Sequence, residues 1–338
     1  MILIEKSLVM KKSPTAICHA STVLKLPSGE FLCAWFGGSE EGASDVGIYL
    51  SRRKEGGDFL PPVCMAESSE AHWNPVLFSS GGGKVILYYK TGQKISDWRT
   101  YIRISEDGGN TFGPEKELVK GDSGGRGPVK NKPIRLTSGR VLAPGSLEKN
   151  TWKAFADWSE DGGETFTQSN LIGIPGIEKK KCQNEGDIPV SSQSFHHRGV
   201  IQPTLWEDTE GVVHMLLRSS EGRVYRSDSH DGGSNWSEAY MTNVLNNNSG
   251  LDLTRLSDGR IVLVHNPVGK SWGARTPLSV SVSEDNGRSF NKVFDLEKEE
   301  GEYSYPAIIS EGNDCYITYT LRRENIAFCH LKAENLKI

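Results

Sequence analysis

Features that mark several classes of protein are missing from this sequence. No apolar run approaches the roughly 18 residues that a membrane-spanning helix needs. Neither sign of charge dominates, because 39 Lys and Arg face 43 Asp and Glu, for a formal net charge of −4. There is no basic stripe with interleaved aromatic residues, which would indicate nucleic-acid binding. We therefore expect a globular protein with no membrane or nucleic-acid partner.

Cysteine is scarce, and it lacks any pattern that indicates chemistry. The six cysteines show neither a close pair nor metal-like spacing; they are Cys18, Cys33, Cys64, Cys182, Cys315 and Cys329. Buried thiols in a reducing compartment explain such usage best. At the N-terminus the apolar stretch is too short for a signal peptide, since Glu5 follows at once. We expect a cytoplasmic protein with no metal and no organic cofactor.

What the sequence does contain is a repeated corner. Four segments follow the pattern S-x-D-x-G-x-[ST]-[FW], loosened only at Asn235, and a decayed fifth copy spans residues 51–59. The copies start at residues 51, 105, 159, 229 and 283, so the intervals are 54, 54, 70 and 54 residues. Asp can accept hydrogen bonds from backbone amides, and Gly supplies positive φ, so each copy is expected to be a hairpin corner. A fixed period of this size indicates a radial repeat.

A second repeat, of strand, glycine-containing turn and strand, runs out of phase with the first. Its six copies surround the glycines at positions 29, 81–83, 139, 211, 259 and 312. Six such hairpins followed by outer strand pairs predict an all-β, six-bladed β-propeller that uses residues 1–338 as a single domain. The first strand, Ile2 to Val9, falls outside the six units. We predict that it joins the last blade beside Asn325 to Leu331, closing the ring and covering two sheet edges.

The one irregular interval carries an insertion from Ile177 to Phe195. A polar insertion between blades is usually a solvated loop, and a lid over the binding face is the alternative. The pair His196-His197 just beyond it is too isolated to indicate a metal site.

Side chains suited to hydrogen bonding recur where the chain enters each inner strand. In a propeller these entries, together with the loops joining second and third strands, build a pocket over the axis. The entries contribute His19, Trp73, Asn74, Lys130, Lys132, Gln202, Asn248, Tyr303 and Tyr305. The connections contribute Asp45, Lys90, Arg218, Arg223 and Arg275. Aromatic faces beside amides and an excess of cations are typical of a site for a sugar that carries a carboxylate.

These Asp boxes resemble those of the sialidase (neuraminidase) superfamily over essentially the whole chain. Sialidases hold the substrate carboxylate with three arginines and use a tyrosine nucleophile, helped by a glutamate, and an aspartate acid/base. The resemblance implies that Asp45 is the acid/base and that Arg223 and Arg275 are the second and third arginines. It also implies that Tyr303, in a Tyr-Ser signature, is the nucleophile, with Tyr305 as its competitor.

Two departures from the sialidase pattern indicate a divergent, sialidase-like BNR-repeat branch. His19 stands where the resemblance places the first clamp arginine. Gln202 stands where the assisting glutamate is expected, and Gln cannot take a proton; Glu221 is near enough in sequence to substitute for it.

Three functions follow from these residues, and the sequence leaves all three open. The first is a retaining exo-glycosidase acting on a terminal acidic sugar, in which cations such as Lys90, Lys130 and Lys132 assist the tyrosine. The second is a uronate lyase, in which His19 or a tyrosine removes the proton alpha to the carboxylate. The third is a non-catalytic propeller that binds glycans. In each case the expected partner is a glycan with an acidic sugar, and the sequence does not predict the oligomeric state.

Overall fold

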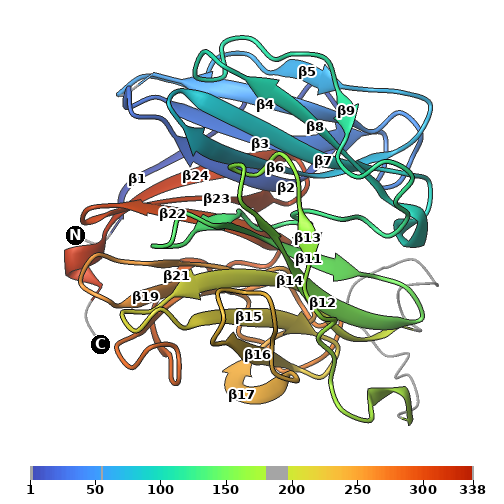
Figure 1. Cartoon of the computed structure of the whole chain (residues 1–338). Helices are drawn as coiled ribbons and strands as arrows, with labels where there is room; N and C mark the ends of the chain where they lie inside the picture. Colours follow the sequence, from blue (N-terminus) through green and yellow to red (C-terminus); the bar gives the residue numbers. More distant parts are fainter. Residues whose placement is uncertain (1–2, 55, 180–196, 337–338) are drawn as a thin grey trace.

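The computed structural model describes residues 3–54, 56–179 and 197–336, and strands make up nearly all of its regular structure (Figure 1). Helical structure in these residues is limited to three single 3-10 turns, at Ile95–Asp97, Ile177–Lys179 and Ala333–Asn335. None of the described helices is long and apolar enough to cross a membrane. Apart from its first residues, the loop or lid predicted at 177–195 lies outside the described residues. The predicted all-β class is confirmed.

Successive strands pair into antiparallel sheets in the order of the sequence. One sheet holds β2 (Ile17–Lys25), β3 (Phe31–Gly38), β4 (Gly47–Arg53) and β5 (Val63–Ala66). The next holds β6 (His72–Gly81), β7 (Lys84–Thr91), β8 (Arg99–Ser105) and β9 (Lys116–Glu117). A third four-stranded sheet holds β18 (Asp252–Arg255), β19 (Ile261–His265), β20 (Leu278–Ser283) and β21 (Asn291–Glu297). Such hairpin-connected sheets agree with the strand–turn–strand repeat in the sequence.

An eight-stranded sheet lies between these units in the chain. Its first half is β10 (Ile134–Arg135), β11 (Val141–Leu147), β12 (Thr151–Ser159) and β13 (Thr167–Gln168). Its second half is β14 (Arg198–Glu207), β15 (Val213–Ser219), β16 (Arg223–Ser229) and β17 (Tyr240–Leu245). Within each half all the pairs are antiparallel. The halves join through a short parallel pairing of β12 with β14, at Thr151 with Arg198 and Trp152 with Gly199.

The last sheet combines the two ends of the chain. It contains β22 (Tyr303–Glu311), β23 (Asp314–Leu321), β24 (Asn325–Lys332) and β1 (Leu3–Leu8). In this sheet β1 runs antiparallel beside β24, with Leu3 opposite Leu331 and Leu8 opposite Ala327 (Figure 1). The first strand therefore has the neighbour that the sequence predicted.

The Asp boxes fasten each sheet to the one before it in the chain. The carbonyl of the fourth residue of a box accepts a hydrogen bond from a side chain of the preceding unit. The pairs are Arg52 with Gly108 (2.7 Å), Ser80 with Gly162 (2.8 Å), Arg140 with Gly232 (3.1 Å) and Arg226 with Asn286 (2.9 Å). The boxes thus hold successive units of the fold together, and the box at residue 229 joins the two halves of the eight-stranded sheet.

Asp161 shows how the Asp of a box stabilises its turn. It accepts hydrogen bonds from Ser159 Oγ (2.7 Å), Glu164 N (3.0 Å) and Thr165 N (3.0 Å). Burial acts to raise the pKa of Asp161, but these bonds outweigh it and lower the pKa to about 2. The stability that the carboxylate contributes is therefore present above its unfolded pKa of about 3.9 and is lost as pH falls towards 2.

We expect Asp161→Ala to lower the free energy of unfolding by about 2 kcal/mol at neutral pH, since charged hydrogen bonds typically contribute 1.5–3 kcal/mol. Urea titrations at neutral pH and at pH 3 check this, and the gap between variant and parent should narrow in acid. Glu160→Ala, in the same turn but 60% exposed, is the control and should change stability little. An equal gap at both values of pH would contradict the role given to the carboxylate.

The buried carboxylate of Asp252, at the start of β18, contacts three other segments of the chain. Asp252 is 1% exposed and pairs with Lys132 Nζ at 3.0 Å from both oxygens. It also accepts hydrogen bonds from Thr204 Oγ1 (2.6 Å) and from the backbone amide of Ile308 (2.9 Å). The partners come from β14, from β22 and from the loop before β10, so this carboxylate joins strands of three sheets.

Candidate functional site

Inner strands of three of the four-stranded units, and β14, share a local distortion at their entry. The antiparallel register slips between His19 and Thr22, Trp73 and Val76, Ile201 and Thr204, and Ser304 and Ala307. Inside these bulges Ala20, Asn74, Gln202 and Tyr305 have positive φ, between 41° and 55°. Positive φ is uncommon for residues other than Gly, and bulges re-aim side chains next to functional sites. The polar residues at these entries were recognised in the sequence, whereas the bulges were not.

Tyr305 and His19 meet at the centre of this arrangement. Their rings lie 4.3 Å apart between centroids, and both residues are buried. The Tyr305 hydroxyl accepts a hydrogen bond of 2.7 Å from Arg218, which also donates to Gln202 Oε1 (3.0 Å) and Asn248 Oδ1 (2.8 Å). We call the set His19, Lys130, Gln202, Arg218, Asn248, Arg275 and Tyr305 the central cluster.

Cations surround the imidazole of His19. Burial lowers the pKa of His19 well below its usual value, and Arg323, Arg275, Lys130 and Arg218 act in the same direction. The imidazole is therefore neutral at physiological pH, with one nitrogen able to accept a hydrogen bond or a proton. A neutral base among cations is suited to a ligand that brings negative charge.

Arg275 and Arg323 share one carboxylate of the protein itself. Glu302 binds Arg275 through one oxygen and Arg323 Nε (3.0 Å) through the other. Burial acts to raise the pKa of Glu302, but the two guanidinium groups lower it to about 2, so it stays ionised. Arg275 lies 5.5 Å from the Tyr305 ring, and among the described residues its buried Nε has no hydrogen-bond partner. The arginine pair is thus partly neutralised but keeps a free donor.

Lys130 reaches into the same region from the loop before β10. Its ammonium donates to Asn131 Oδ1 (2.8 Å) and to the Pro306 carbonyl, and it lies 6.0 Å from the centre of the Tyr305 ring. Burial lowers the pKa of Lys130 to about 7, against the opposing effect of Asp252. Its charge therefore falls as pH rises through 7.

Several buried polar side-chain atoms, on strands and on loops, have no hydrogen-bond partner in the part of the chain that the structure describes. Within the described residues they include both ring nitrogens of His19, Thr91 Oγ1, Trp98 Nε1, Asn247 Oδ1, Ser249 Oγ, Asn266 Oδ1 and Arg275 Nε. Buried polar groups are normally hydrogen-bonded, so each such atom needs an explanation. These are the groups that a polar ligand can engage.

Four predicted site residues have their side chains occupied elsewhere. Tyr303 packs in an apolar cluster with Leu278 and Ile308, and its hydroxyl accepts a hydrogen bond from Arg322 (3.1 Å). The other three bind protein acceptors: Lys90 binds Thr100 Oγ1 and the carbonyls of Gly125 and Arg126, Lys132 binds Asp252, and Arg223 binds the Asn243 carbonyl. The structure therefore brings Tyr305, and not Tyr303, to the central cluster.

Asp45 lies on the loop between β3 and β4. It is exposed, and its carboxylate accepts hydrogen bonds from the backbone (3.0 Å) and hydroxyl (2.9 Å) of Ser39. The same loop is tied to the region of the central cluster by the ion pair of Glu41 with Arg323 (2.5 Å). On the other side Gln93 donates to the Gly42 carbonyl (2.7 Å). The loop of Asp45 is thus anchored on both sides, and the Asp45 carboxylate makes no ion pair among the described residues.

Aromatic rings flank the predicted binding residues. Trp73 packs beside Trp98 and donates to the Gly92 carbonyl, while Asn74 next to it is buried. Trp152 and Trp272 lie 5.8 and 5.5 Å from the Arg218 guanidinium. Trp152, Arg323, Glu302 and Glu148 were not among the site residues singled out from the sequence, because a charge or a ring in a loop does not show which way its side chain points.

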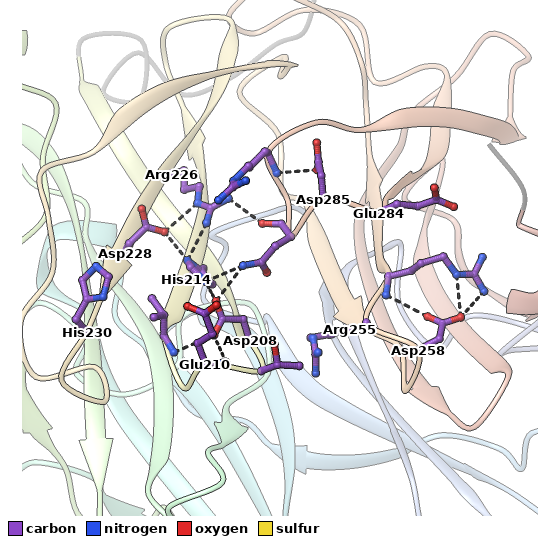
Figure 2. A pocket seen from close by; sticks show the side chains of 16 residues that line it. Asp208, Glu210, His214, Arg226, Asp228, His230, Arg255, Asp258, Glu284 and Asp285 are labelled. Atoms are coloured by element: carbon purple, nitrogen blue, oxygen red, sulfur yellow. Dashed lines mark hydrogen bonds and ion pairs between the residues drawn. The ribbon is translucent and has the colours of Figure 1, made fainter.

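A pocket of about 700 Å³ lies elsewhere, beside the Asp box at residue 283 (Figure 2). His214 contacts Asp208 (2.9 Å) and Asp228 (2.5 Å) there, and Arg226 donates to Asp228 (2.9 Å). Figure 2 shows these charged groups turned towards one another across the wall. Asn286 of the Asp box connects this cluster to the next sheet, because its side chain donates to Asp208 (3.0 Å) and its carbonyl accepts a hydrogen bond from Arg226 (2.9 Å). Among the described residues no group of three His, Cys, Asp or Glu is arranged to hold a metal.

Several solved structures share this fold. The chain is similar to a protein of unknown function from Dyadobacter fermentans DSM 18053, with a TM-score of 0.73 at 14% identity over 98% of both chains. It is similar to the Hadza microbial sialidase Hz136, with a TM-score of 0.73 at 14% identity, over 95% of this chain and 66% of that one. A third is the intramolecular trans-sialidase from Ruminococcus gnavus, with a TM-score of 0.69 at 12% identity over 96% of both chains. The chain has the sialidase-like fold.

The family follows from the sequence itself. The model of the BNR repeat-like domain matches residues 29–317. This chain belongs to that family, as a sialidase-like member of the BNR-repeat superfamily. The comparison with curated proteins returned no match.

Proposed function

We propose that this protein is a glycosidase that cleaves a terminal acidic sugar at the central cluster, with Tyr305 in the role that the sequence had given first to Tyr303. The observation that carries this proposal is the contact of the Tyr305 hydroxyl with Arg218 beside a neutral His19. The unpaired donor of Arg275 and the cationic surroundings fit the carboxylate of the sugar. Family membership supports carbohydrate chemistry and leaves the substrate to be tested.

The proposed reaction uses few groups of this chain. Tyr305 gives its phenol proton to solvent water and attacks the anomeric carbon, while the glycosidic C–O bond breaks and Asp45 gives its proton to the leaving oxygen. Water then attacks the anomeric carbon and gives a proton to Asp45, and Tyr305 leaves as a phenolate that takes a proton back from solvent. Arg218, which already binds the phenol oxygen, stabilises it as a leaving group in the second step.

We infer that the sheets form a closed, six-bladed propeller over residues 1–338. The eight-stranded sheet divides naturally at the two-residue parallel pairing of β12 with β14. Neighbouring units touch along their inner strands, since β2 contacts both β6 and β22, and β18 contacts both β14 and β22. In such a ring the entries of all the inner strands face one axis, where the central cluster would bind its ligand.

A specific observation favours a uronate lyase as the second candidate. Neither ring nitrogen of His19 has a hydrogen-bond partner among the described residues, although the ring is buried against Tyr305. A neutral imidazole so placed can remove the proton alpha to a carboxylate held by arginine. The glycosidic C–O bond then breaks, a C=C bond forms, and Tyr305 returns a proton to the leaving oxygen.

Product analysis tests the two candidates. Purified protein is incubated with a fluorogenic sialoside, a fluorogenic glucuronide and uronate-containing oligosaccharides. Hydrolysis releases reducing sugar without ultraviolet absorbance from an unsaturated uronate, whereas elimination produces that absorbance. If none of the three substrates is cleaved, both enzymatic candidates are rejected and glycan binding without catalysis is the reading that is left.

His19→Gln separates the candidates further. For the lyase we expect at least about a hundredfold loss of kcat, because the base is removed. For the glycosidase we expect a smaller loss of kcat/KM, arising mainly from a higher KM, because His19 only lines the site. Steady-state kinetics on the best substrate measures both constants, and His72→Gln, at the next inner-strand entry but with its Nδ1 bound to the Val46 carbonyl, is the matched control.

A further inference from the structure

Two arginines occupy the tight turn between β23 and β24. Arg322 and Arg323 both have positive φ, 53° and 59°. The turn is closed by the amide of Glu324, which donates to the carbonyl of Leu321 (3.0 Å). A turn with positive φ at both central positions normally holds Asn and Gly, because these residues tolerate that conformation best. Backbone preference therefore does not account for arginine at either position.

The side chains of these two arginines have different partners. Arg322 binds the Tyr303 hydroxyl (3.1 Å), outside the central cluster. Arg323 binds Glu302 through its Nε (3.0 Å), and its carbonyl accepts a hydrogen bond from the amide of Cys18 (2.8 Å). Arg323 thus lies against the entries of β2 and β22, the two strands whose rings meet in the central cluster.

Arg323 and Arg275 bind the two oxygens of one carboxylate. Glu302 accepts Arg275 through Oε1 and Arg323 through Oε2. The two guanidinium groups therefore stand at a spacing that suits a single carboxylate. Neither Arg275 Nε nor Arg323 Nη2 has a hydrogen-bond partner among the described residues. A carboxylate that a ligand brings therefore finds a donor on each arginine.

A second carboxylate of the protein occupies the outer end of Arg323. Glu41, on the loop that also carries Asp45, binds Arg323 Nη1 at 2.5 Å. The Glu41 side chain is 38% exposed and pairs with this one cation, whereas Glu302 pairs with two arginines. Exposed ion pairs contribute little, because solvent screens them. Of the two carboxylates on Arg323, Glu41 is therefore the one that a ligand can displace.

We propose that Arg323 selects acidic sugars, because the carboxylate of the ligand replaces Glu41 on its Nη1 and is shared with Arg275. A guanidinium and a carboxylate form short, charge-assisted hydrogen bonds that a neutral sugar does not offer. Glu41 holds this place when no ligand is bound. The inference rests on the proposed function for the position of the sugar, but it is measured by binding alone, without turnover.

Ligand-detected NMR titrations measure this selectivity. The probes are N-acetylneuraminate and glucuronate, each compared with its methyl ester, which keeps the sugar ring but lacks the charge. We expect Arg323→Gln to weaken binding of the acid about tenfold and binding of the ester less than about twofold. Arg322→Gln is the matched control, since it has the same sign of φ and its guanidinium binds Tyr303; it should bind both probes as the parent does.

Glu41→Gln gives a readout that a merely structural role would not give. It removes the carboxylate that competes for Arg323, so we expect the acid to bind about threefold more tightly and the ester to bind unchanged. The contact of Gln93 with the Gly42 carbonyl (2.7 Å) still anchors the loop in this variant. If the ion pair only held the loop in place, the two variants would shift binding in the same direction.

Several results would overturn the inference. They are a parent that binds neither acid sugar or binds acid and ester equally well, a folded Arg323→Gln that binds the acid as the parent does, and a Glu41→Gln that does not bind it more tightly. Should Arg323→Gln fail to fold, Glu41→Gln and the preference of the parent for acid over ester decide. If product analysis finds no cleavage but binding follows the expected pattern, the glycosidase proposal fails and the role of Arg323 stands.

Discussion

Tyr305→Phe is expected to lower kcat/KM by about 1,000-fold, roughly 4 kcal/mol of activation free energy, while leaving the fold intact. The substitution removes only the hydroxyl that Arg218 binds at 2.7 Å. The ring keeps its contacts with His19 and Arg275, so packing at the centre should not change. The measurement is steady-state kinetics on the substrate found by product analysis, with thermal unfolding as the check on folding.

Tyr303→Phe is the matched control, two residues away on the same strand. Its hydroxyl binds Arg322 outside the central cluster, so we expect kcat/KM to stay within about threefold of the parent. The opposite ranking, with Tyr303→Phe inactive and Tyr305→Phe active, would refute the assignment and restore the role that the Tyr-Ser signature implied.

The second large effect is on stability. We expect Asp252→Ala to lower the free energy of unfolding by about 3–5 kcal/mol, because it leaves the partly buried Lys132 without a counter-charge. It also leaves Thr204 and the Ile308 amide without their acceptor. Guanidinium titration monitored by tryptophan fluorescence measures the loss.

A double variant separates the ion pair from the rest of this network. When both partners of a buried pair are replaced, the loss is often much smaller than for one partner alone. We therefore expect Lys132→Met combined with Asp252→Ala to recover part of the stability lost in Asp252→Ala. If the double variant is less stable than the single one, the cost lies in the hydrogen bonds to Thr204 and Ile308 and not in the unpaired ammonium.

The period of the Asp boxes was enough to predict much of the fold. It predicted an all-β chain of repeated hairpins, and it placed β1 beside β24, because a strand outside the repeats needs a partner. The ends of strands and the bulges at Asn74 and Gln202 were not predictable, since φ depends on packing against neighbouring sheets. The insertion was visible as a longer interval, but its shape was not.

The site was predictable by region and less so by residue. The polar entries contributed His19 and Tyr305 to the central cluster, and the connections contributed Arg218 and Arg275. Which of two neighbouring tyrosines faces inwards depends on strand register, and a slip of one or two residues at the bulge changes the answer. Lys90 looked like a ligand for an acidic sugar because sequence shows a charge but not the carbonyls that surround it.

The pairing of β1 with β24 also constrains the order in which the sheets form. During synthesis, residues 3–8 leave the ribosome more than 300 residues before their hydrogen-bonding partners, so this strand stays unpaired until β24 has been made. Every other sheet can be completed from a local stretch of nascent chain. Formation of this last sheet is therefore a non-local step with a high loop-closure cost, and we expect it to set the pace of refolding.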